Sequence, residues 1–166
     1  MQRNRVILGS VLLALVAGLL LFFLMPTDAK RLQAFTKGLV MINLPVEAGT
    51  VAYRYTYTEA SKTTQLQPLY FTAMNLNMAA KKALTQVNTL LIVPQFNNKK
   101  VQAYVNYTRE LYIIYLNTVI KVSQETINLA IKTGYISKLP PLIMPKTDQV
   151  SASLTQAFAV LYAKKS

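Results

Sequence analysis

The side chains that could perform acid–base chemistry are six carboxylates, and they lie far apart along the chain. They are Asp28, Glu47, Glu59, Glu110, Glu125 and Asp148. Because no two of them lie within four positions of each other, none forms the carboxylate pair on one helix face that binds metal ions in helical bundles. The chain also has no histidine and no cysteine, which removes the usual metal ligand, the usual general base and every thiol reaction. We therefore expect a protein that is not an enzyme and that binds no cofactor or metal ion.

Two further arrangements of reactive residues are less specific. Ser61–Lys62 and Ser137–Lys138 place a hydroxyl next to an amine, but chance adjacency explains both pairs. The five glycines stand singly, so the chain has no glycine-rich loop that would cradle a phosphate group. Neither arrangement changes the expectation that the protein is not an enzyme.

Three tyrosines at alternate positions are the candidates for binding a partner. Tyr53, Tyr55 and Tyr57 alternate with smaller or polar residues between Val51 and Thr58, which is the period of a β-strand with one aromatic face. Such a face packs against a neighbouring strand, or binds a partner by strand addition. Stacking on nucleic-acid bases is the alternative, which we favour less.

Four lysines are the candidates for binding a polyanion. They form two adjacent pairs, Lys81–Lys82 and Lys99–Lys100. After residue 26 the chain has 16 basic and 6 acidic residues, an excess that attracts phosphate groups and makes such binding fall with salt. The basic residues are nevertheless spread along the chain, which is more typical of a solvated surface than of one binding footprint.

The segment from Val6 to Met25 is predicted to be a membrane anchor. Its twenty residues carry no charge and are nearly all apolar. As a helix they span roughly 30 Å, the thickness of the hydrocarbon core of a bilayer. A cleaved signal peptide is the alternative, but its apolar region usually runs only about 7–15 residues. A type IV pilin is less favoured still, because pilins usually keep a glutamate near the start of the apolar helix and no acid precedes Asp28 here. The anchor residues that we single out are Val6, Leu12, Leu15, Leu20, Phe22 and Phe23.

Basic residues flank the anchor on both sides and are predicted to lie at the membrane interface. They are Arg3, Arg5, Lys30 and Arg31. Because the charges on the two sides nearly balance, the positive-inside rule gives little direction. A short basic tail before an anchor conventionally stays in the cytoplasm. We therefore expect a single-pass protein whose C-terminal domain lies on the non-cytoplasmic side.

The residues after the anchor are predicted to form a short helix and a β-hairpin. Asp28 to Lys37 has the pattern of a short amphipathic helix, with Gly38 as its left-handed cap. Residues 39–44 and 51–58 are predicted strands, and the turn between them contains Pro45 and Gly49.

Three helices are predicted after the hairpin. Pro68 opens the first, whose apolar residues recur at spacings of three and four up to Leu90. The second runs from Asn98 to Thr133 and is apolar over most of its circumference, as expected for the centre of a bundle. The third runs from about Asp148 to Ala163. The side chains that we expect to be buried are Leu76, Val87, Ile114, Ile120, Leu154 and Leu161.

The predicted fold class is therefore mainly α, with an N-terminal transmembrane helix followed by a short β-hairpin and a small helical bundle of about three helices. The corresponding division of the chain is an anchor with a basic tail in residues 1–27, the juxtamembrane helix and hairpin in residues 28–67, and the bundle in residues 68–166. Charged residues make up only 14% of the chain, against about a quarter in typical soluble domains. A surface with so few charges suits contact with other subunits or with lipid.

The function that we expect is that of a non-catalytic, single-pass membrane-anchored structural or assembly subunit of a larger membrane-associated complex. Its partners would be other protein subunits, including copies of itself, and the lipid bilayer. One alternative is a virion or envelope membrane protein. Another is an anchored binder of a polyanion, namely nucleic acid, acidic lipid or a cell-wall polymer, with nucleic acid the less favoured partner.

Overall fold

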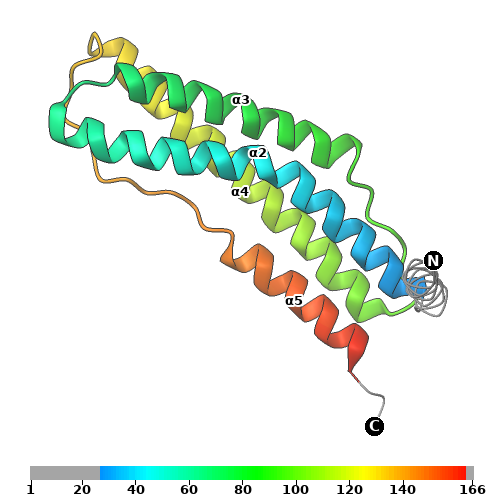
Figure 1. Ribbon diagram of the computed structural model, residues 1–166. Coiled ribbons are helices and arrows are strands. Elements are labelled where there is room, and N and C mark those ends of the chain that lie inside the picture. The colour runs from blue at the N-terminus through cyan, green and yellow to red at the C-terminus, as the bar shows by residue number, and fades with distance from the viewer. Residues whose placement is uncertain (1–26, 164–166) are drawn as a thin grey trace, which may run out of the picture.

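The computed structural model describes residues 27–163 of the chain, and this part is a bundle of four helices (Figure 1). They are α2 (Thr27–Thr63), α3 (Gln67–Thr89), α4 (Lys99–Lys132) and α5 (Asp148–Tyr162). Figure 1 shows α2, α3 and α4 side by side along the molecule, with the shorter α5 along one half of α4. The start of α2, the α3–α4 loop and the end of α5 lie at one end of the bundle. The α2–α3 connection lies at the other end.

The predicted fold class is wrong in its N-terminal half. Thr27–Thr63 is one continuous helix, and the described residues contain no strand; the only strand-like pairing there is an isolated bridge between Gln65 and Ile136. No helix among residues 27–163 is long and apolar enough to cross a membrane, which also departs from the predicted fold class. The predicted anchor, residues 6–25, lies outside the described residues, as do Arg3 and Arg5.

The spacing of the buried residues explains why α2 is a helix throughout. Its core-facing residues recur at intervals of three and four positions from one end to the other, which is the period of a helix and not of a strand. The predicted cap at Gly38 does not end the helix, and the chain continues through Gly38, Pro45 and Gly49. Pro45 removes one helical hydrogen bond but lies on the exposed side, where water can bond the freed carbonyl. The buried residues are Asp28, Ala29, Leu32, Phe35, Leu39, Ile42, Val46, Thr50, Tyr53, Tyr57 and Ala60.

The two glycines of α2 mark close contacts with the rest of the bundle. A methyl group built on Gly49 would lie 3.2 Å from Leu76 Cδ1 and 3.4 Å from Leu76 Cα on α3. A methyl group on Gly38 would lie 3.1 Å from Leu91 Cδ1, in the loop after α3. Gly49 therefore lets α2 approach the backbone of α3, whereas Gly38 faces the end of one side chain.

The three predicted helices after residue 67 are present at nearly the predicted bounds. Pro68 lies in the first turn of α3, and the Asn98 side chain caps α4 by accepting hydrogen bonds from the backbone N–H groups of Lys100 (3.0 Å) and Val101 (3.3 Å). The predicted apolar seam of α3 is buried except for Leu90, which is 69% exposed. The seam residues that are buried are Leu69, Ala73, Leu76, Ala80, Ala83 and Val87.

Five of the six side chains expected in the core are buried or partly buried. Leu76 and Val87 are fully buried, and Ile120, Leu154 and Leu161 pack against the core with part of their surface exposed. The prediction for Ile114 is wrong, because this side chain is 61% exposed on the outer face of α4. The run from Leu111 to Leu116 is apolar at every position, so its periodicity does not distinguish the inner face from the outer one.

Buried polar pairs tie the helices to one another. The Asn77 amide of α3 donates hydrogen bonds to the Ser123 hydroxyl and the Ile120 carbonyl of α4, each at 3.0 Å. Thr108 of α4 pairs with Ser153 of α5, their hydroxyl oxygens 3.0 Å apart. Each pair forms only in one register of the two helices, since an unpaired buried polar group would cost free energy. These contacts therefore fix how far each helix can slide along its neighbour.

Candidate functional site

The three tyrosines predicted to bind a partner do not share one face. Residues two positions apart on a helix point roughly 200° apart, so the alternation that aligns them on a strand separates them on α2. Tyr53 is fully buried and Tyr57 is 8% exposed, and their ring centroids are 5.8 Å apart. Tyr55 is 70% exposed. Only Tyr55 is therefore accessible to a partner.

Tyr53 and Tyr57 connect α2 to the opposite side of the bundle. The Tyr53 hydroxyl forms a 2.6 Å hydrogen bond with the Thr126 hydroxyl of α4, and burial raises the pKa of Tyr53 to about 12. The Tyr57 hydroxyl donates a hydrogen bond to the Pro140 carbonyl, and burial raises its pKa as well. From the other side, the Tyr112 hydroxyl of α4 donates to the Asn43 side-chain oxygen of α2 at 3.0 Å, and burial raises the pKa of Tyr112. All three phenols are neutral hydrogen-bonding groups at physiological pH and are not poised as bases.

A cleft of about 490 Å³ lies between Tyr53 and Tyr57 of α2, helix α4 and the proline-rich segment that precedes α5. Tyr53, Tyr57, Lys121 and Glu125 contribute to its lining together with apolar side chains from residues 139–145. Within residues 27–163, every fully buried side-chain oxygen or nitrogen has a hydrogen-bond partner. The buried hydroxyls of the cleft are thus already paired with protein atoms, which makes the cleft a weaker candidate for a ligand site than the surface of α2.

The outer face of α2 has a row of exposed apolar side chains, which we call the outer stripe. It consists of Met41 (62% exposed), Leu44 (53%), Val51 (65%) and Tyr55 (70%). The exposed Ala48 fills the gap between Leu44 and Val51, so that the positions follow spacings of three and four. This is the seam by which one helix packs against another. Sequence reasoning missed it because residues 39–44 and 51–58 were interpreted as strands; read with a helical period, the same residues reveal it.

The lysines predicted to bind a polyanion lie on two helices. Lys81 and Lys82 are exposed in the middle of α3, and Lys99 and Lys100 are exposed in the first turn of α4. Lys82 precedes the end of α3 by seven residues, or roughly 10 Å of helix. The two pairs therefore occupy different levels of the bundle.

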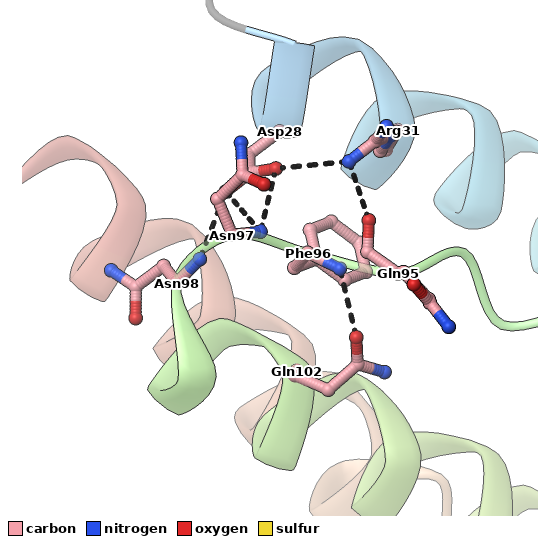
Figure 2. A network of polar contacts seen from close by, with 7 residues as sticks. All are labelled: Asp28, Arg31, Gln95, Phe96, Asn97, Asn98 and Gln102. Carbon is pink, nitrogen blue, oxygen red and sulfur yellow. Dashed lines mark hydrogen bonds and ion pairs between the residues drawn. The ribbon is translucent and has the colours of Figure 1, made fainter.

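Of the predicted interface residues Lys30 and Arg31, Arg31 belongs to a polar network at the start of α2 (Figure 2). The Asp28 carboxylate accepts hydrogen bonds from the backbone N–H groups of Asn97 (3.0 Å) and Asn98 (3.1 Å), and it pairs with Arg31 at 3.5 Å. Arg31 in turn donates to the Gln95 carbonyl at 2.6 Å, and Lys30 is half-buried. The network fastens the α3–α4 loop to the start of α2.

The carboxylates do not converge in the described part of the chain. There, no three of the side chains that commonly bind metals come together. Comparison of the chain with protein-family models, with curated proteins and with solved structures found no match.

Proposed function

We propose that the protein is a non-catalytic assembly subunit, attached to a membrane by the apolar segment of residues 6–25, and that it binds a helix of a neighbouring subunit along the outer stripe of α2. The observation that carries the proposal is the outer stripe itself. Met41, Leu44, Val51 and Tyr55 are each more than half exposed although the bundle has a well-buried core elsewhere. A contiguous row of this kind marks a protein-interaction surface more often than it marks free solvent.

The spacing of the stripe supports a helix as the partner. Positions 41, 44, 48, 51 and 55 repeat in the pattern of a coiled-coil seam, in which each side chain enters a gap between side chains of the facing helix. The exposed Glu47 and Arg54 lie beside the stripe and are of opposite sign, and the exposed Lys37 lies at its N-terminal end. Such flanking charges suit pairing with complementary charges on a neighbouring helix.

The test replaces two stripe residues by charged ones. Leu44→Asp with Val51→Asp places two carboxylates in the proposed contact, and desolvating them should weaken the complex at least about tenfold, which corresponds to about 1.4 kcal/mol. The matched control is Phe71→Asp with Ile131→Asp, at exposed apolar positions of α3 and α4 (55% and 58% exposed). Native mass spectrometry of the full chain purified from its own membranes in mild detergent measures the retained partner.

We expect the stripe variant to lose its partner and the control variant to keep it, with circular dichroism showing that both remain helical. Retention of the partner by the stripe variant would refute the proposal. A partner released by moderate salt and by neutralising Lys81, Lys82, Lys99 and Lys100, but not by the stripe changes, would indicate a polyanion binder instead, because such binding depends on screened charge.

A further inference from the structure

We propose that the partner bound by the outer stripe is the α2 helix of a second copy of this chain, packed antiparallel to the first about a two-fold axis between Gly49 and Thr50. The inference rests on the proposed function, because it names the partner of the same surface. Three features of α2 support a second copy, namely the charges beside the stripe, the sizes of the stripe residues and the register that the charges select.

The first feature is a pair of opposite charges on one side of the stripe. Glu47 and Arg54 are exposed and lie seven residues apart, roughly 10 Å along the helix, which is too far for them to face each other. Neither side chain forms an ion pair within residues 27–163. In an antiparallel pair with two-fold symmetry, the same side of each stripe faces its own copy. Glu47 of each chain then lies against Arg54 of the other, within roughly 3 Å of the same level along the helix axes, and the contact forms twice.

A parallel copy would use these charges less well. The other side of the stripe carries the uncharged Pro45 and Ala52, followed by Glu59. In a parallel pair this side faces the charged one, so Glu47 would lie against Ala52. Arg54 would lie near Glu59, whose carboxylate already forms an ion pair at 2.9 Å on its own helix. Only the antiparallel arrangement gives both charges a partner that is otherwise unpaired.

The second feature is the size of the side chains along the stripe. The antiparallel arrangement places Ala48 of one copy opposite Val51 of the other, and Leu44 opposite Tyr55. The smallest side chain of the row thus meets a branched one. A parallel pair would place Ala48 opposite Ala48 and Tyr55 opposite Tyr55, which leaves a gap at one level and crowds another. The sizes therefore favour the same arrangement as the charges.

The third feature is that the charges exclude the neighbouring registers. Sliding one copy by seven residues keeps a helical seam in contact but changes which charges meet. In one direction Glu47 lies against Glu47 of the second copy, and in the other direction Arg54 lies against Arg54. The same shifts bring Lys37 or Lys62 into the apolar row. In the proposed register these two exposed lysines lie beyond the last apolar layer, where water solvates them, and they end the contact.

The rest of each bundle leaves the contact open. Leu44 and Ala48 each lie two positions from the buried Val46, which is roughly 200° around the helix, so the stripe faces away from the core of its own bundle. The starts of the two α2 helices would lie roughly 70 Å apart, at opposite ends of the pair. Two copies attached to one bilayer can adopt this arrangement when α2 lies along its surface.

The test reverses one charge at a time in the full chain, purified in a non-ionic detergent. Glu47→Arg leaves two cations beside the stripe, and Arg54→Glu leaves two carboxylates. Sedimentation equilibrium measures the dissociation constant of the dimer for each variant and for an equimolar mixture of the two. The matched controls are Glu110→Arg and Lys82→Glu, which make the same changes of net charge at exposed positions of α4 and α3.

We expect each variant alone to dimerise about tenfold more weakly than the wild-type chain, because two attractive pairs become two repulsive ones. The equimolar mixture should form a mixed dimer with a dissociation constant within about threefold of the wild-type value, because every cation again faces a carboxylate. Both controls should match the wild-type chain within about twofold, because their charges lie outside the contact.

A mixture that dimerises no better than its two components would overturn the inference, and so would variants that dimerise as tightly as the wild-type chain. A loss confined to Arg54→Glu would also overturn it, because that result would indicate a parallel pair that uses Glu59. The proposed function is tested separately. A chain that is monomeric by sedimentation, yet loses a different subunit in the Leu44→Asp with Val51→Asp variant, refutes only the inference drawn here, whereas a chain with no partner of either kind refutes both.

Discussion

Replacing Gly49 by Ala should destabilise the bundle even though alanine is the better helix former. Removing a glycine from a helix interior is worth about 1 kcal/mol in favour of the variant. Against this, the new methyl group would lie 3.2 Å from Leu76 Cδ1 and 3.4 Å from Leu76 Cα. The 3.4 Å contact is ordinary van der Waals contact, so the crowding comes from Cδ1. Because Leu76 is fully buried, its Cδ1 can move away only by displacing neighbouring core side chains. Crowding of this kind costs about 1–3 kcal/mol, so the cost wins and the net loss should be about 1 kcal/mol.

Gly38→Ala is the matched control for this prediction. It lies in the same helix and gives the same gain in helix propensity, but its new methyl group would meet only Leu91 Cδ1, at 3.1 Å. Both contacts are to the end of a leucine side chain, but Leu91 belongs to a loop after α3 and is 7% exposed, so a small shift should relieve the contact more easily than at Leu76. We therefore expect Gly38→Ala to be neutral or to stabilise the bundle by up to about 1 kcal/mol.

Urea unfolding of the full chain in a non-ionic detergent, followed by circular dichroism at the helix band, measures both changes. A double variant with Leu76→Ala supplies a further check, because removing the crowded side chain should abolish most of the cost of Gly49→Ala. The reasoning would be refuted if Gly49→Ala were as stable as Gly38→Ala, since the two variants differ only in what their methyl groups touch.

Three other outcomes follow from the described contacts. Tyr53→Phe should cost about 1 kcal/mol at neutral pH through its lost bond to Thr126. An unfolded tyrosine ionises near pH 10, whereas burial raises the pKa of Tyr53 in the folded protein to about 12. The unfolding free energy of the wild-type protein should therefore fall as the pH rises from about 10 to 12, and that of Tyr53→Phe should fall less. An equally steep fall in the two proteins, measured by unfolding at alkaline pH, would contradict this. Asp28→Ala should cost about 2 kcal/mol, because two backbone N–H groups lose a charged acceptor, and amide exchange in the α3–α4 loop should accelerate; unchanged exchange would argue against the network. Ile114→Gln should change the unfolding free energy by less than about 0.5 kcal/mol, whereas Leu116→Ala should cost about 2–5 kcal/mol, as urea unfolding would show.

The helices after residue 67 could be predicted from the sequence because their signals are redundant. Pro68 and Asn98 mark helix starts, and the seam from Leu69 to Val87 repeats without interruption. In α4 the length of the segment excluded a strand, although the apolar run around Ile114 did not reveal which face is buried.

The N-terminal half was mispredicted because local signals conflict with the longer pattern. Alternating tyrosines, together with Gly38, Pro45 and Gly49, are typical of strands and turns over a window of eight residues. The helical spacing becomes visible only over the whole of Thr27–Thr63, from Leu32 through Tyr53 to Ala60. Burial of that face against α3 outweighs the local preferences, which is how tertiary packing usually overrides propensity. The outer stripe was missed for the same reason, since it exists only on a helix.

The segment between α4 and α5 makes α5 the element that should open most easily. Pro140, Pro141 and Pro145 have no N–H to donate, and α5 itself buries only Val150, Ser153 and Ala157. Its neighbour is α4, with little contact to α2, so α5 can separate without disturbing the other three helices. In hydrogen exchange the molecule should therefore behave as two cooperative units, a slow core of α2, α3 and α4 and a fast unit containing α5. A protease that cuts within residues 139–147 would release the second unit and leave the first folded.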